Sequence, residues 1–202
     1  MDSDNDHAVA AKPTLAYYNR KLSVREIRAE KILLAAQSLF AKQGFRRVTM
    51  ERIAEAAGMA KTTLYAYFSD KDVVFKAVAE LTARRMEQDY LHALTKQELL
   101  VDKVSAALIA KHRVTFELVR SSEHAAELFA IKNRLIGALF SDMDETLIRH
   151  TADVIEQTLA IEDALKIARV VFHASLGIAN GIGDMKEVEE GITMLVRGFL
   201  EC

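Results

Sequence analysis

Hydroxyl-bearing and basic side chains gather in one short segment of the chain. Residues 60–68 read AKTTLYAYF, which places a lysine, two threonines and two tyrosines within nine residues. Lysine can donate to guanine, threonine can hydrogen-bond a base or pack its methyl on thymine, and tyrosine hydroxyls can reach phosphates. The segment therefore predicts contact with a nucleic acid.

The residues before this segment supply the scaffold that such contact needs. We expect one helix from about Thr49 to Ala57, a tight turn centred on Gly58 and a second helix over 60–68. Thr49 can cap the first helix, and Glu51 in its first turn is favoured by the helix dipole. Two short helices joined at a glycine turn predict a helix-turn-helix, whose second helix enters the major groove of DNA.

Base contacts and backbone contacts fall on different residues of this unit. The start of a recognition helix faces the base edges, so we assign Lys61, Thr62 and Thr63 to the groove. The predicted backbone contacts are Arg46, Thr49, Tyr65, Tyr67 and Lys71. Two alternatives stay open: one or both tyrosines pack in a half-buried position, and the two lysines are merely solvated.

The charge distribution adds a weaker signal. Residues 14–71 hold eleven Lys and Arg against five Asp and Glu, whereas residues 72–202 hold fifteen against twenty-one. A basic first third on an acidic body indicates that one end meets a polyanion. The alternative is an ordinary solvated helix surface.

Composition excludes several other classes of protein. Half of the residues are apolar, 28% are charged, and Pro13 is the only proline. The one cysteine, Cys202, excludes an internal disulfide, and no apolar run reaches the ~18–20 residues of a membrane span, so we expect a cytoplasmic protein. The six histidines lack metal-ligand spacing, and no nucleophile is paired with a base. We therefore expect no metal, no cofactor and no enzymatic activity.

Helical periodicity continues through the rest of the chain and predicts an all-α fold. Gly44 fits the end of a first helix, Ser69 and Asp72 form a capping-box spacing, and Asp163 and Asp184 are candidate caps. The expected helices cover about 24–43, 49–57, 60–68, 70–93, 98–119, 122–131, 132–159, 162–182 and 186–201. We expect a mobile arm over 1–20, a DNA-binding domain over 21–70 and a larger helical domain over 71–202.

Motifs spread over the first three helices carry a family resemblance. They are Ile32-x-x-Ala35-Ala36-x-x-Leu39-Phe40-x-x-x-Gly44-Phe45, Thr49-x-x-x-Ile53-Ala54-x-x-Ala57-Gly58-Met59 and Thr63-Leu64-Tyr65-x-Tyr67-Phe68-x-x-Lys71. Over about residues 25–78 the chain resembles the DNA-binding half of the TetR family of bacterial transcriptional regulators. It departs from the family's usual pattern at Ala60, which stands for a capping serine, and at Thr62, which stands for glycine. These departures concern the operator sequence and not the fold.

The resemblance implies a homodimer that binds a palindromic operator in double-stranded DNA, most simply a repressor released by a small effector. The large side chains of the middle helices suggest an apolar or amphipathic effector, held by His112, Phe116, Phe129, Phe140, Met143, Phe172 and His173. The candidate dimer surface is Ile167, Val170, Val171, Ala174, Ile178 and Ile182 on the helix over 162–182, and Ile192, Leu195, Val196 and Phe199 on the helix over 186–201. Both sets can instead belong to the core of the monomer.

Two other functions remain open at this point. One is a TetR-like architectural or activating factor without a ligand. The other is an all-α enzyme or interaction module whose helix-turn-helix is only structural. The basic residues Arg20, Lys21 and Arg25 can extend DNA contact into the minor groove, or can belong to a leader with no contact.

Overall fold

The computed structural model describes residues 23–96, 98–117 and 122–201, and every regular element among them is helical. The helices are α1 (Val24–Gln43), α2 (Met50–Ala56), α3 (Lys61–Tyr65), α4 (Lys71–Thr95), α5 (Leu100–Thr115), α6 (Ala125–Leu159), α7 (Ala164–Gly181) and α8 (Met185–Leu200). The predicted all-α fold is confirmed. The expected arm over 1–20 lies outside the described residues. No helix in the described part of the chain is long and apolar enough to cross a membrane.

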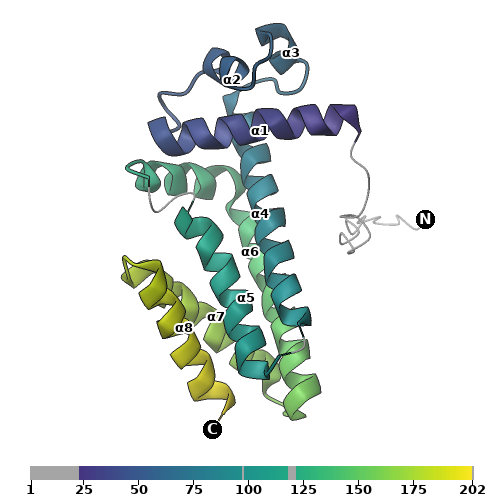
Figure 1. Ribbon diagram of the computed structural model, residues 1–202, viewed down its shortest axis with the longest axis vertical. Coiled ribbons are helices and arrows are strands. Elements are labelled where there is room, and N and C mark those ends of the chain that lie inside the picture. Colours follow the sequence, from purple (N-terminus) through teal and green to yellow (C-terminus); the bar gives the residue numbers. More distant parts are fainter. Residues whose placement is uncertain (1–22, 97, 118–121, 202) are drawn as a thin grey trace, which may run out of the picture.

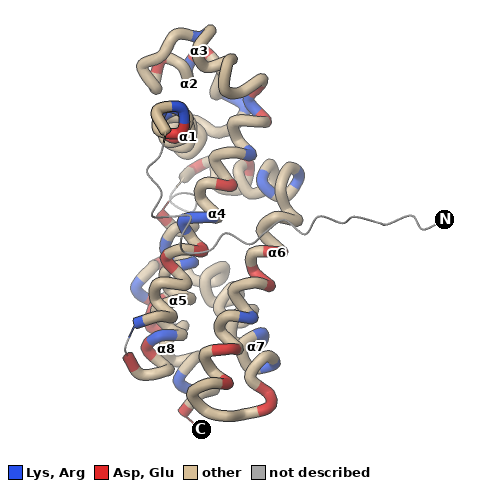
Figure 2. Tube along the Cα trace, turned by 90° about the vertical axis from the view of Figure 1, so that its right-hand side faces the viewer, with Lys and Arg blue, Asp and Glu red and all other residues tan. Residues whose placement is uncertain are grey.

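The molecule is elongated, with the three N-terminal helices at one end. Figure 1 shows α1, α2 and α3 together at the top, with α4 running down from them into a bundle beside α5 and α6. Helices α7 and α8 lie lower in the molecule, and α8 packs on α5 and α7. The view of Figure 2, turned by 90°, shows acidic and basic residues interspersed along the bundle.

Two clusters of buried side chains hold this arrangement. The first joins α1, α2 and α3 to the start of α4 and to Leu128 of α6. At its centre the rings of Phe40, Phe45 and Phe75 lie 5.3–5.5 Å apart, two of the three pairs edge to face. The second cluster fills the bundle around Tyr90 and Phe172. α4 contributes to both clusters, and α6 contributes to the first cluster before its break at Ile136 and to the second cluster after it.

Several helix ends follow the predicted chemistry. The Thr49 hydroxyl accepts a hydrogen bond from Arg52 N at the start of α2, and Asp184 accepts from Lys186 N and Glu187 N at the start of α8. Gly44 ends α1 with a φ of 76°, a conformation that residues with a Cβ rarely adopt. Ala60 starts α3 without a side-chain hydrogen bond, as expected for an alanine at that position.

Other helix ends differ from the prediction. The cap of α4 is Asp70, which accepts from Val73 N at 2.9 Å, and Ser69 only donates to Asp70. Asp163 makes no capping hydrogen bond, because its φ of −87° and ψ of 13° are not the extended backbone of a capping residue. α5 ends at Thr115, ahead of the predicted end at Val119, which lies outside the described residues.

The two helices predicted over 122–131 and 132–159 are the two limbs of α6, and the break between them lies at Ile136 instead of between residues 131 and 132. Its irregularity comes at Ile136, where φ is −147° and ψ is 24°, directly before Gly137. Ser122 acts ahead of α6, where its hydroxyl bonds Ala41 O and His124 N.

Candidate nucleic-acid interface and effector cavity

Packing of α2 against α3 fixes which side chains face outward. Ile53, Ala57 and Leu64 are almost completely buried between the helices, and Gly58 turns the chain with a φ of 64°. The opposite side of α3 is left open: Lys61 and Thr62 are exposed and Thr63 is partly exposed. The structure therefore brings the three predicted base-contacting residues together on one outer surface.

Lys61 has a partner that the sequence analysis missed. Its ammonium forms an ion pair with Glu51 of α2, and both side chains are 55% exposed. The hydrogen bond from Lys61 is the main reason that the pKa of Glu51 falls to about 2, and the same bond raises the pKa of Lys61. A base or phosphate that binds Lys61 must therefore compete with this carboxylate.

The two tyrosines predicted to contact phosphates occupy different surroundings. Tyr65 is 44% exposed, and Lys61 Nζ lies 5.8 Å from the centre of its ring. Tyr67 is partly buried beside Phe68, and the Arg25 guanidinium lies 5.7 Å above its ring. The packing alternative left open by the sequence therefore describes Tyr67 better than Tyr65. DNA contact by either residue stays a prediction.

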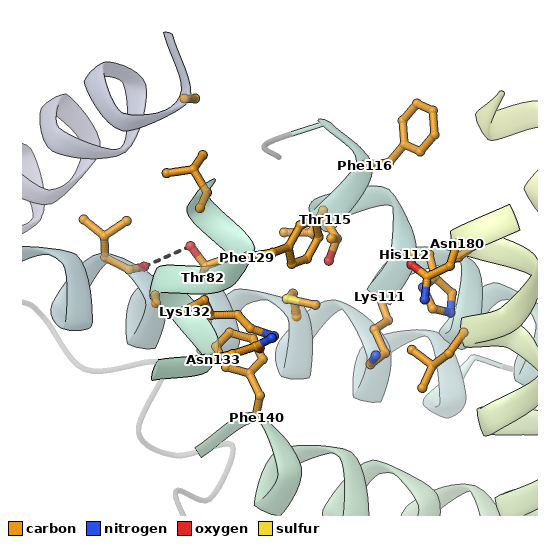
Figure 3. Close-up of a pocket in the computed structure, with 18 of the residues that line it drawn as sticks. Thr82, Lys111, His112, Thr115, Phe116, Phe129, Lys132, Asn133, Phe140 and Asn180 are labelled. Atoms are coloured by element: carbon orange, nitrogen blue, oxygen red, sulfur yellow. Dashed lines mark hydrogen bonds between the residues drawn. The ribbon is translucent and has the colours of Figure 1, made fainter. Parts of the chain in front are cut away.

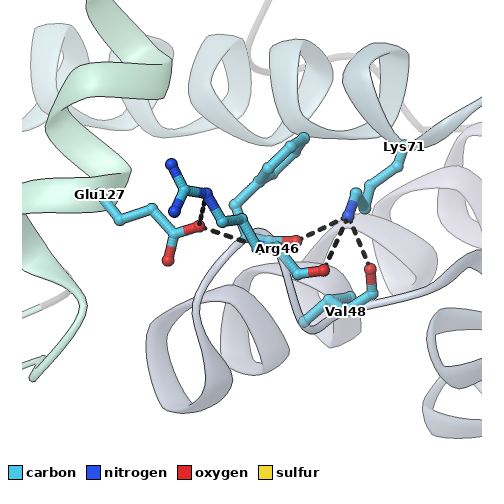
Figure 4. A network of polar contacts seen from close by, with 5 residues as sticks. Arg46, Val48, Lys71 and Glu127 are labelled. Carbon is cyan, nitrogen blue, oxygen red and sulfur yellow. Dashed lines mark hydrogen bonds and ion pairs between the residues drawn. The ribbon is translucent and has the colours of Figure 1, made fainter.

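Lys71 lies at the start of α4 and points back at the loop between α1 and α2. Its ammonium donates to Phe45 O at 2.8 Å, Val48 O at 2.9 Å and Arg46 O at 3.4 Å, and lies 4.4 Å from the Phe45 ring (Figure 4). An ammonium has three donors, and all three are used here. Lys71 thus ties α4 to the loop, and the predicted phosphate contact requires a phosphate oxygen to replace one carbonyl.

The same loop is held by α6. Glu127 Oε1 accepts from Arg46 N at 2.9 Å and lies 3.7 Å from Arg46 Nε, whereas the Arg46 side chain is 88% exposed (Figure 4). A Cβ added to Gly44 would lie 2.5 Å from Glu127 Oε2. The loop ahead of the helix-turn-helix is therefore hydrogen-bonded to α4 through Lys71 and to α6 through Glu127.

A cavity of about 460 Å³ lies below this loop, lined mainly by residues of α4, α5 and α6. Four of the predicted effector-contacting residues line it: His112, Phe116, Phe129 and Phe140. The other three do not. Met143 and Phe172 are buried in the bundle core, and His173 is exposed.

Three charged side chains at the cavity were absent from the prediction. Lys111 is 5% exposed, and its Nζ lies 3.4 Å from Asp144 Oδ1. Lys132 Nζ lies 4.7 Å from the centre of the Phe140 ring. Burial lowers the pKa of both lysines. Figure 3 shows Lys111 and Lys132 among the aromatic side chains of the cavity. Helical periodicity placed these residues on helices but could not place them on a common wall.

The predicted dimer residues are mostly covered in the single chain. Val171 is buried, Phe199 is 44% exposed, and Ile167, Ala174, Ile178 and Leu195 are partly buried. Val170 of the predicted surface is exposed, and so are two apolar residues that the prediction did not include, Leu165 and Met194. Apolar side chains are therefore exposed on α7 and α8, and they overlap the expected set only at Val170 and Phe199.

Comparison with known proteins identifies the N-terminal unit. Residues 32–78 match the sequence model of the bacterial regulatory proteins of the tetR family. The uncharacterized HTH-type transcriptional regulator Rv1255c of Mycobacterium tuberculosis is 26% identical over 122 residues, which are 60% of this chain and 58% of that protein. The chain thus spans less than two thirds of that relative. The HTH-type transcriptional repressor KstR of Rhodococcus jostii is 27% identical over 169 residues, or 81% of this chain and 76% of that protein.

The fold of the whole chain is also shared with solved structures. The structure of Salmonella enterica GusR superposes with a TM-score of 0.66 at 21% identity, covering 91% of this chain and 100% of that one. At this identity the likeness shows the fold alone. Together with the motifs of α1–α3, these findings lead to one conclusion: residues 32–78 match the N-terminal unit of the tetR family of bacterial regulatory proteins, and the chain shares the fold of solved TetR-like regulators.

Proposed function

We propose that the protein is a transcriptional repressor that binds a palindromic DNA operator as a homodimer and is released by a small apolar or amphipathic effector. The observation that carries the proposal is the outer surface of α3, where Lys61, Thr62 and Thr63 lie open on a tightly packed helix-turn-helix. The similarity to KstR, an HTH-type transcriptional repressor, supports repression over activation.

DNA binding follows from the arrangement of the N-terminal unit. Residues 21–70 act as the DNA-binding domain, with the start of α3 in the major groove and Lys61 exchanging Glu51 for a guanine or a phosphate. Arg46, Thr49 and Tyr65 lie at the surface beside α3 and hold the backbone. Two such units match operator half-sites that are about 34–36 Å, or one DNA turn, apart.

Dimerisation through α7 and α8 is supported by their exposed apolar residues. Met194 is 74% exposed and Val170 and Phe199 are each 44% exposed, so these helices carry apolar side chains that a partner could cover. A Cβ built on Gly177 or Gly198 would have no atom within 4 Å, so these positions leave room for a partner helix. In the larger domain over 71–202 this surface is the one that best fits a second copy of the chain.

Release by an effector is supported by the position of the cavity. Phe75 and Val78 of α4 and Leu128 and Phe129 of α6 line it. These two helices also hold the loop between α1 and α2 through the hydrogen bonds of Lys71 and Glu127. A ligand that changes the separation of α4 and α6 therefore changes the position of α3. Its effect is limited by its preference for one separation over the other.

Selection from random double-stranded DNA tests the proposal without knowledge of the operator. Purified protein should enrich a palindrome whose half-sites lie one turn apart, and sedimentation should show a dimer both free and bound. Enrichment of no sequence by folded, dimeric protein at low salt would contradict the proposal. The cavity favours this function over that of a factor without a ligand, which needs no cavity.

A further inference from the structure

The cavity is unbalanced in charge, and this imbalance points to the chemistry of its ligand. Only Lys111, Lys132 and Asp144 carry a formal charge among the residues that line it, with the histidine taken as neutral. Two cations thus share one carboxylate in a site whose other walls are largely apolar. Lys132 is half-buried, and a partly buried charge without a counter-ion is disfavoured, so the site favours a compound that supplies the missing negative charge.

The contacts of the three groups show where that charge is missing. Asp144 Oδ1 lies 3.4 Å from Lys111 Nζ, but it makes no hydrogen bond within the described structure. Lys132 has no ion pair with a described carboxylate, and its ammonium rests on the rings of Phe140 at 4.7 Å and Phe129 at 5.8 Å. The charge of Lys132 also helps to lower the pKa of Lys111. The two ammonium groups therefore repel each other across the same wall.

On this basis we propose that the effector is an amphipathic anion, with one acidic group held by Lys132 and Lys111 and an apolar body along Phe75, Met86 and Phe129. The proposal rests on the proposed function, because it names the chemical class of the effector for that same cavity. An acid oxygen between the two ammonium groups would gain charge-assisted hydrogen bonds, which are about twice as strong as neutral ones.

The size of the cavity limits the apolar body. At about 30 Å³ for each water-sized group, 460 Å³ holds about fifteen such groups. This is the size of a fused aromatic acid or a medium-chain carboxylic acid. Lys132 and Glu127 lie five residues apart on the first limb of α6, so a headgroup bound at Lys132 would contact the same helical segment that holds Arg46.

Two pairs of compounds that differ only in charge test the proposal. The first is 1-anilinonaphthalene-8-sulfonate against uncharged N-phenyl-1-naphthylamine, followed by their fluorescence. The second is decanoate against 1-decanol, followed by displacement of the bound dye. We expect the anion of at least one pair to bind about tenfold or more tightly than its neutral match, since about 1.4 kcal/mol of added interaction is tenfold.

Substitutions test whether the preference for the anion comes from Lys132 in the cavity. Lys132→Met should abolish it, Lys132→Arg should retain it, and Lys76→Met, an exposed lysine of α4, should leave it unchanged. Lys132 is only half-buried, so its variant should fold, which circular dichroism checks. Equal affinities in both pairs, or a preference that survives Lys132→Met, would overturn the proposal. Retained operator binding would then show that the proposed function stands without it.

Discussion

Replacement of Lys71 by methionine gives the sharpest test of how the DNA-binding end is held. The variant removes the ammonium that donates to the carbonyls of Phe45, Val48 and Arg46 while keeping most of the apolar stem. Two of these three bonds are partly buried, and a hydrogen bond from a charged group contributes about 1.5–3 kcal/mol. Water can replace the ammonium at the exposed Arg46 carbonyl.

The expected loss is smaller than the sum of these bonds. The carbonyls are only partly buried. In addition, a cation in the first turn of α4 is unfavourable to the helix dipole, so its removal stabilises the helix by about 0.3–1 kcal/mol. We expect the free energy of local opening around residues 40–60 to fall by about 2–3 kcal/mol, which speeds amide exchange there by about 30- to 150-fold.

Hydrogen exchange followed by mass spectrometry measures this directly. Lys76→Met is the matched control, because it changes an exposed lysine of the same helix. Exchange over residues 40–60 that stays within threefold of the control would refute the idea that Lys71 stabilises the loop between α1 and α2. The same variant tests the predicted phosphate contact: if Lys71 also binds a phosphate, the slope of log affinity against log salt becomes shallower by about 0.9.

Three further predictions concern other parts of the molecule. Glu51→Gln should raise affinity for the selected operator more than for a scrambled duplex, because Lys61 loses its competing partner; an unchanged operator isotherm would contradict this. Gly44→Ala should destabilise the fold by about 1–3 kcal/mol in chemical denaturation, through its φ of 76° and the close approach of the new Cβ to Glu127, whereas Gly137→Ala, in open space, should not; equal effects would contradict this. Met194→Glu should weaken the dimer at least about tenfold in sedimentation by facing two carboxylates across the symmetry axis, and an intact dimer would exclude α8 from the interface.

The sequence predicted several helix ends well because their signals are local. The caps at Thr49 and Asp184 and the glycine at the end of α1 depend on residues within one turn, and each is confirmed. Errors arose where two signals compete over a few residues. Asp70 and Ser69 are both good caps, and only the backbone conformation decides that Asp70 is the residue that caps α4.

The contacts between residues far apart in the sequence could not be predicted. The pairs Lys71–Phe45, Arg46–Glu127 and Lys111–Asp144 join residues 26, 81 and 33 positions apart, which no periodicity relates. A lone lysine on an amphipathic helix usually lies in solvent, and Lys111 departs from that rule because α5 is enclosed by its neighbours. The sequence also showed that the aromatic residues lie on the middle helices, but it could not show which of them pack in the core and which line the cavity.

The specificity of DNA binding is the most direct test of the central claim, that the start of α3 reads the operator. The measurement compares dissociation constants for a selected operator and a scrambled duplex at one salt concentration, for the protein and for a variant with Lys61→Ala, Thr62→Ala and Thr63→Ala together. If each base contact contributes about 1–3 kcal/mol, the specificity ratio should fall at least about 100-fold, while affinity for the scrambled duplex changes little. An equal loss on both duplexes, or an unchanged ratio in a folded variant, would contradict this account.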